Sequence, residues 1–168
     1  NGIKNIIEYF IKKGIQGIWV LGTGSEDYLL TFEQRYEVIR FVSKEFSGQI
    51  KIFAGISFLS FHESLLFLDQ INNFDLAGIH YINYNNLIGE KLIYELYLKI
   101  SQLSKHPVWL YSSANWGKKL SFSIVNEISK LPNIKGCKYS TSNIVEMEKI
   151  ISLQNKDFIV LPAVVRSL

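Results

Sequence analysis

The stretch that decides the fold class is PVWLY (107–111), then SFSIVNEISKL (121–131), then NIKGCKYS (133–140). The first and last of these segments are short apolar runs, which are typical of strands covered on both faces. The middle segment predicts a helix. A strand, a helix and a second strand in this order form a parallel βαβ unit, so the chain is of the α/β class.

The same alternation extends outward in both directions. The expected helices cover residues 3–13, 31–46, 60–71, 89–104, 121–131 and 142–153. The expected strands cover residues 17–21, 50–56, 76–82, 108–111, 134–138 and 158–161. Capping-box patterns at Thr31-Phe32-Glu33-Gln34 and Ser60-Phe61-His62-Glu63 mark two helix starts. Residues 1–168 therefore read as one unit of six strands and six helices.

This alternation fits two architectures, a doubly wound open sheet or a (β/α)₈ barrel. A closed barrel has eight strands and takes about 250 residues. Six strands in 168 residues complete an open sheet, and they also match the middle of a barrel. The periodicity of the sequence does not choose between these two architectures.

Composition excludes several functional classes. The chain is 48% hydrophobic and 20% charged, with a net charge of +3 and no continuous basic stripe, so we expect no nucleic-acid partner. It has no apolar run of about 18 residues, so we expect no membrane span. The single cysteine, Cys137, cannot form an internal disulfide and fits a cytoplasmic location. The chain starts without methionine or a signal-peptide pattern, so we expect the natural protein to extend upstream.

Three strand ends carry candidate site residues. The loop Gly22-Thr23-Gly24-Ser25 follows the first strand, and its small residues and hydroxyls suit an anion. Tyr111 ends the fourth strand and Lys138 the fifth. A partly buried lysine has a lowered pKa and acts as a nucleophile toward carbonyls, while a tyrosine can relay its protons. Taken singly, these residues also read as a tight turn, an edge tyrosine and a solvated lysine.

Their common placement favours the functional interpretation, because parallel α/β folds build sites at the carboxyl ends of strands. A metal site has little support, since His62, His80 and His106 lack metal-ligand spacing. Cys137 should point away from Lys138 and reads as a core thiol. No nucleophile elbow surrounds Ser25.

At this point the sequence resembles the dihydrodipicolinate synthase/N-acetylneuraminate lyase family of Schiff-base aldolases. The resemblance rests on residues 17–26 (GIWVLGTGSE), 30–35 (LTFEQR), 52–55 (IFAG), 107–111 (PVWLY) and 131–140 (LPNIKGCKYS). It implies a (β/α)₈ barrel that here lacks the first strand, the last strand and later helices. It also implies a homotetramer and a step such as that of lysine biosynthesis.

The resemblance further implies how the site would work. Lys138 would form an imine with pyruvate or a related 2-oxo acid, Tyr111 would shuttle protons, and Tyr84 would complete the relay near a subunit interface. Thr23, with Gly24 and Ser25, would hold the substrate carboxylate. An aldehyde would be the second substrate, and neither a metal nor an organic cofactor is needed.

The chain departs from the family pattern where the aldehyde would bind. Gly24 replaces the second threonine of the family's Thr-Thr pair, and residues 111–117 (YSSANWG) lack its proline and arginine. Tyr139 replaces an aspartate, and residues 162–164 (PAV) replace its Gly-Asp. A sialic-acid or other 2-keto-3-deoxy sugar-acid lyase, a non-catalytic degenerate barrel and an unrelated open-sheet binder therefore stay as alternatives.

Overall fold

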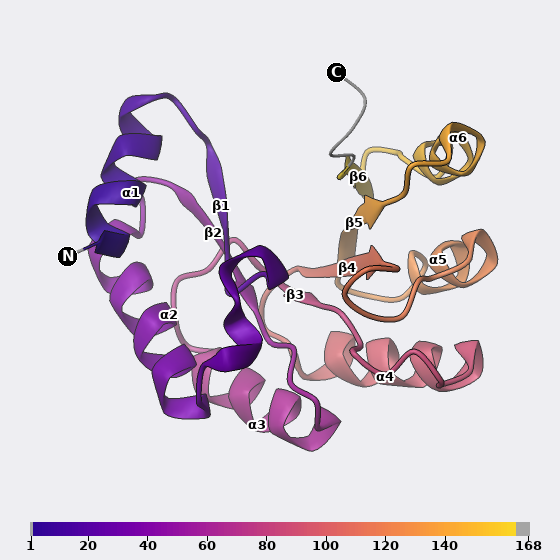
Figure 1. Cartoon of the computed structure of the whole chain (residues 1–168), viewed down its shortest axis with the longest axis horizontal. Coiled ribbons are helices and arrows are strands. Elements are labelled where there is room, and N and C mark those ends of the chain that lie inside the picture. The colour runs from indigo at the N-terminus through magenta and orange to yellow at the C-terminus, as the bar shows by residue number, and fades with distance from the viewer. Residues whose placement is uncertain (1, 164–168) are drawn as a thin grey trace.

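The computed structural model describes residues 2–163, which form a curved parallel sheet with helices along its convex side (Figure 1). The strands are β1 (Gly17–Val20), β2 (Lys51–Gly55), β3 (Gly78–Tyr81), β4 (Val108–Ser113), β5 (Ile134–Ser140) and β6 (Ile159–Pro162). The helices are α1 (Gly2–Lys12), α2 (Phe32–Phe46), α3 (Phe61–Ile71), α4 (Glu90–Leu103), α5 (Phe122–Ile128) and α6 (Ile144–Ile151).

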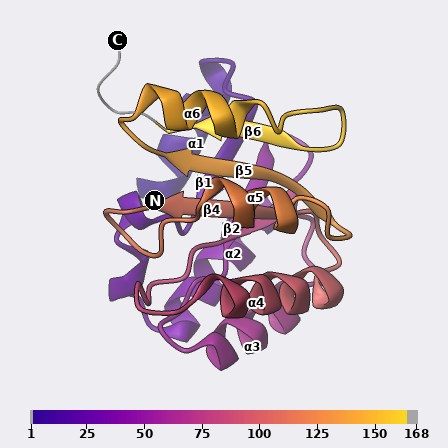
Figure 2. The same cartoon turned by 90° about the vertical axis from the view of Figure 1, so that its right-hand side faces the viewer.

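The sheet topology selects between the two expected architectures. Each strand pairs in parallel with the next one along the chain, in the order β1-β2-β3-β4-β5-β6. A doubly wound sheet would instead reverse its order at a switch point. The strands follow an arc that is open between β1 and β6, and α4, α5 and α6 lie on its outer side (Figures 1 and 2). This is part of a (β/α)₈ barrel, which confirms the expected fold class.

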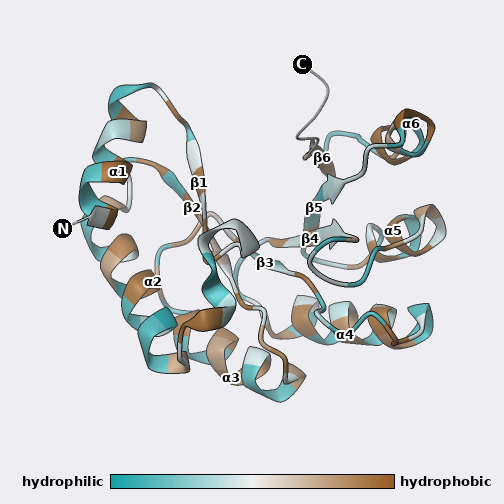
Figure 3. Cartoon of the chain, viewed as in Figure 1, coloured by the Kyte–Doolittle hydropathy of each residue, from teal (hydrophilic) through white to brown (hydrophobic). Residues whose placement is uncertain are grey.

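The core lies between the helices and the sheet. The helices are amphipathic, with apolar and polar patches alternating along them (Figure 3). Their inward side chains are fully buried at Ile39, Val42, Phe67, Ile93 and Ile100. Burying one such side chain contributes about 1.5–3 kcal/mol, so this layer holds the helices on the sheet. No helix within residues 2–163 is long and apolar enough to cross a membrane.

The predicted helix starts differ in how fully they are capped. Thr31 accepts from the Gln34 N–H at 3.3 Å, and the Gln34 side chain accepts from the Thr31 N–H at 2.9 Å. That capping box is confirmed. Ser60 accepts from the Glu63 N–H at 3.4 Å, without a reciprocal bond among the described residues. The second prediction is therefore right about the cap and wrong about the box.

Each strand differs from the prediction by one or two residues at one or both ends, and among the carboxyl ends those of β4 and β5 differ most. β4 continues to Ser113 and β5 to Ser140, so Tyr111 and Lys138 each lie two residues before a strand end. In β4 and β5 the run of apolar residues ends before the backbone pairing between the two strands ends. Ser112 continues the ladder opposite Tyr139, and its hydroxyl accepts from the Leu120 N–H at 3.0 Å. A polar side chain with a buried partner can continue a strand.

Candidate active site

Tyr111 and Lys138 face each other across β4 and β5. They are register partners, and the Lys138 Nζ lies 4.2 Å from the centre of the Tyr111 ring. Their neighbours Leu110 and Cys137 belong to the core under the helices. Because successive side chains of a strand alternate, Tyr111 and Lys138 point to the concave face.

Thr23 joins this pair from the first strand's loop. Its Oγ1 lies 2.8 Å from the Tyr111 hydroxyl, in a hydrogen bond in which either oxygen can donate. Thr23 is buried in a short 3₁₀ turn, η1 (Thr23–Ser25). The structure therefore brings together three of the six residues singled out from the sequence.

The surroundings of Lys138 favour its neutral form. The side chain is half-buried, and burial lowers its pKa below the ordinary lysine value. A buried amine loses hydration of its charged form. The Trp19 ring centre lies 5.5 Å from Nζ, and within residues 2–163 no carboxylate forms an ion pair with this amine.

Trp19 and His80 pack beside the site. Their rings stack with centroids 4.1 Å apart. The His80 Nε2–H donates to the Val20 carbonyl at 3.1 Å, and burial lowers the pKa of His80 to about 3. The imidazole is thus neutral at physiological pH, as expected for a packed core histidine.

Ser25 and Gly24 lie at the surface of the same loop. The Ser25 hydroxyl donates to the Gly22 carbonyl at 2.7 Å, so it closes its own turn and is not brought to Tyr111. A Cβ at Gly24 would meet no atom within 4 Å. The space where the family has a second threonine is therefore open.

Tyr84 reaches the site region through a carboxylate that the sequence analysis missed. Its hydroxyl donates to Asp27, with distances of 3.1 and 3.3 Å to the two oxygens. Asp27 is fully buried and pairs with Arg35, the nitrogen and oxygen being 3.4 Å apart. Among the described residues, the Tyr84 hydroxyl has no hydrogen bond to Thr23 or Tyr111.

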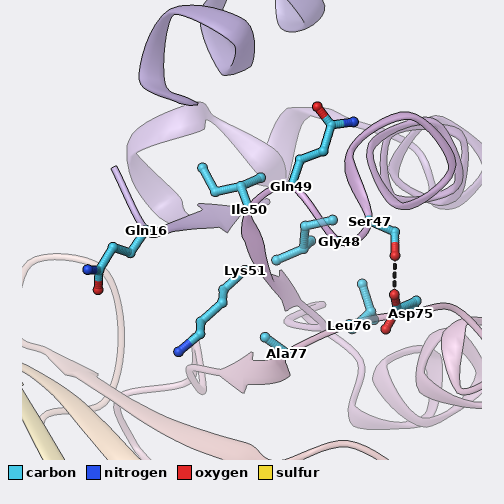
Figure 4. A pocket seen from close by; sticks show the side chains of 10 residues that line it. Gln16, Ser47, Gly48, Gln49, Ile50, Lys51, Asp75, Leu76 and Ala77 are labelled. Carbon is cyan, nitrogen blue, oxygen red and sulfur yellow. Dashed lines mark hydrogen bonds between the residues drawn. The ribbon is translucent and has the colours of Figure 1, made fainter. Parts of the chain in front are cut away.

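A further hollow lies away from this site. A depression of about 600 Å³ is lined by Gln16, Gly48, Lys51, Asp75 and Ala77, among others, where Ser47 donates to Asp75 (Figure 4). These residues lie at the amino ends of β1, β2 and β3. Parallel barrels place chemistry at the opposite ends, so this hollow is not the candidate site.

Neither a metal site nor a reactive thiol is formed by the described residues. Within residues 2–163 no group of three His, Cys, Asp or Glu side chains could hold a metal ion. Cys137 is buried, and desolvation raises the pKa of its thiol. This agrees with its interpretation as a core residue.

Together these features define a parallel (β/α) barrel protein with a lysine, a tyrosine and a threonine clustered toward the carboxyl ends of its strands. The model of the dihydrodipicolinate synthetase family matches residues 1–163, and the chain belongs to this family. The chain is 26% identical over 162 residues to the 4-hydroxy-tetrahydrodipicolinate synthase of Persephonella marina, covering 95% of this chain and 55% of that protein.

Solved structures agree with this assignment. Dihydrodipicolinate synthase from Aquifex aeolicus superposes with a TM-score of 0.89 at 27% identity, covering 96% of this chain and 56% of that one. A prophage protein of the same family from E. coli K12, in complex with pyruvate, superposes with a TM-score of 0.89 at 21% identity, covering 95% and 55%. The chain thus spans about half the length of the relatives it matches.

Proposed function

We propose that the protein is a Schiff-base lyase or synthase that joins pyruvate, or a related 2-oxo acid, to an aldehyde through an imine on Lys138. One observation carries this proposal. The Lys138 Nζ lies on the ring of Tyr111, whose hydroxyl is 2.8 Å from Thr23. Nucleophile, proton carrier and a polar anchor are therefore contiguous.

The chemistry follows from the properties of these groups. The neutral Nζ attacks the keto carbon, a C–N bond forms, and the carbonyl oxygen takes up protons and leaves as water. The cationic imine then withdraws electrons from the adjacent methyl group, which loses a proton and becomes an enamine. The enamine carbon attacks the aldehyde carbon, whose oxygen takes a proton. Water finally hydrolyses the imine and restores the amine.

Tyr111 is the proton carrier in this scheme. Burial raises the pKa of its phenol, while the hydrogen bond with Thr23 opposes that rise. The phenol therefore stays protonated at neutral pH and can donate to the departing oxygen. Thr23 and the backbone N–H of Gly24 would hold the substrate carboxylate, whereas the Ser25 N–H already donates to the Gly22 carbonyl at 2.9 Å.

Tyr84 is our proposed third member of the relay. Its hydroxyl is bound to Asp27 within one chain, so a direct part in proton transfer requires that bond to exchange. The proposed homotetramer, in which Tyr84 lies near an interface, offers a setting for this exchange. We place the reaction in the cytoplasm, as one step of a pathway such as lysine biosynthesis.

A second candidate function is cleavage of a 2-keto-3-deoxy sugar acid or of N-acetylneuraminate. It is favoured by the segment after Tyr111, where Ser112 and Ser113 end β4 and Ala114 begins the following loop, without the arginine of the synthases. Comparing turnover of pyruvate plus aspartate semialdehyde with sugar-acid cleavage separates the two functions. Both use the same imine.

Borohydride trapping tests the shared step. The chain is incubated with pyruvate, reduced with borohydride and mapped by mass spectrometry. We expect the pyruvate adduct on Lys138, and none in Lys138→Ala. Lys135→Ala is the matched control, because Lys135 is an exposed lysine on the same strand. A wild-type chain without an adduct would favour the non-catalytic barrel, and an adduct that persists in Lys138→Ala would place the imine on another amine and overturn the role of Lys138.

A further inference from the structure

A buried ion pair lies beside the candidate site and takes no part in the proposed chemistry. Asp27 belongs to a second 3₁₀ turn, η2 (Asp27–Leu29), and its carboxylate is fully buried. Arg35 in α2 is its partner and is 3% exposed. Two charges are rarely removed from water without a specific arrangement of partners.

The pair joins several loops at the carboxyl ends of the strands. Arg35 donates to the carbonyl of Ser57, after β2, and its guanidinium lies 4.0 Å from the centre of the Phe58 ring. Tyr84, after β3, donates to Asp27. The carboxylate therefore connects the loop after β1 to those after β2 and β3.

The same carboxylate is closely coupled to Thr23. The Glu26 N–H donates to the Thr23 carbonyl at 3.2 Å, and Glu26 has a left-handed backbone with φ of 55°. Asp27 follows directly, and its carbonyl accepts from the Leu30 N–H at 3.0 Å. Only one tight turn separates Thr23 from Asp27, so fixing the carboxylate fixes the turn that carries Thr23.

A buried ion pair is weak evidence for a contribution to stability. The loss of hydration of both charges offsets much of their attraction, and apolar or neutral replacements of similar size are often as stable. A role in placing a neighbouring group accounts better for this pair, because it determines one geometry among several compact ones.

We propose that Asp27, held by Arg35, is a positioning residue that sets the place of Thr23 and the electrostatic surroundings of the Tyr111 phenol. This inference rests on the proposed imine chemistry and concerns the same site. It assigns Asp27 no contact with the substrate. Its effect passes through Thr23, which shares a hydrogen bond with Tyr111.

The charge of Asp27 also acts on Tyr111. The carboxylate contributes to raising the pKa of the phenol, in addition to burial. The other titratable or charged groups near Tyr111, from the elements packed around it, are Lys138 on β5, His80 on β3, Tyr84 after β3 and Tyr97 on α4. His80 is neutral near pH 7, because burial lowers its pKa to about 3.

The test uses exchange of the pyruvate methyl protons with D₂O, followed by NMR. This exchange requires the imine and its proton transfers but no aldehyde. The variants are Asp27→Asn and the double variant Asp27→Asn/Arg35→Gln, which leaves no unpaired buried charge if the single variant fails to fold. Glu37→Gln is the matched control, because Glu37 is an exposed acid on α2 that pairs with Arg40.

We expect the double variant to fold and to lose about tenfold to a hundredfold in the exchange rate per unit of pyruvate concentration, because Thr23 is misplaced. We also expect the alkaline limb of the pH profile of Asp27→Asn to move to lower pH, because this variant removes the negative charge alone and so lowers the pKa of Tyr111. Glu37→Gln should match the wild type in both.

An unchanged exchange rate in a folded double variant would overturn the role of Asp27 in placing Thr23. An unmoved alkaline limb in Asp27→Asn would overturn the electrostatic half alone. Failure of the proposed function looks different, because the wild-type chain would then show neither exchange nor a borohydride adduct.

Discussion

Lys138 meets the face of the Tyr111 ring, and the hydroxyl of that ring meets Thr23. Tyr111 on β4 and Lys138 on β5 are direct register partners, and the Lys138 Nζ is 4.2 Å from the centre of the Tyr111 ring. One tyrosine thus touches the amine with its π face and the loop after β1 with its oxygen. A change at either end of this contact should alter the other.

The first prediction concerns the pH dependence of imine formation. Burial lowers the pKa of Lys138, and only the neutral amine attacks a carbonyl. The rate of pyruvate trapping should therefore rise with pH and level off below the ordinary lysine pKa of about 10.4. Trapping rates measured across pH check this. A midpoint at or above the ordinary value would contradict it.

The second prediction concerns the hydroxyl of Thr23. Thr23→Val removes the partner of the Tyr111 phenol while keeping the side chain's shape. We expect pyruvate methyl exchange to slow by about a hundredfold or more, as for the loss of a proton-transfer partner. Thr23→Ser keeps the hydroxyl and should retain most of the rate. Equal rates in the two variants would show that the hydroxyl has no such role.

The third prediction concerns the packing of β5 on its neighbours. A Cβ at Gly136 would lie 2.3 Å from the Trp109 ring and 2.6 Å from the Ile159 carbonyl oxygen. Gly136→Ala should lower the free energy of unfolding by about 1–3 kcal/mol, because the strands must shift. Gly24→Ala, where a Cβ meets nothing within 4 Å, should change it by less than about 0.5 kcal/mol. Urea denaturation of both variants measures the difference.

The fourth prediction concerns Cys137. Its thiol is buried, and its pKa is raised. Because the thiolate is the reactive form, the native chain should stay unmodified by a thiol reagent while the denatured chain reacts fully. Mass spectrometry before and after denaturation provides the measurement. Rapid labelling of the native chain would mean that β5 opens readily.

The alternation of strands and helices and the triad of Thr23, Tyr111 and Lys138 could be predicted from the sequence. Both depend on local patterns, namely apolar runs and the residues that follow them. The choice of a barrel over an open sheet could not come from periodicity, because it depends on which strands pair. The resemblance to a family supplied that expectation.

The Asp27–Arg35 ion pair could not be predicted from the sequence. Charged residues are almost always exposed, so a loop aspartate and a helix arginine read as solvated. Only the folded chain shows that Asp27, in η2, accepts a hydrogen bond from the Tyr84 hydroxyl. The strand ends were misplaced for a similar reason, since Ser112 and Ser113 are polar yet fully paired.

The sequential strand order has a consequence for the way the site assembles. Tyr111 and Lys138 are brought together by a single βαβ unit, whereas the Thr23–Tyr111 hydrogen bond spans 88 residues and requires four strands in register. Contacts close in sequence form at a lower entropic cost than distant ones. The amine and its aromatic neighbour can therefore meet early in folding, and the proton-transfer partner arrives only when the sheet has propagated back to β1.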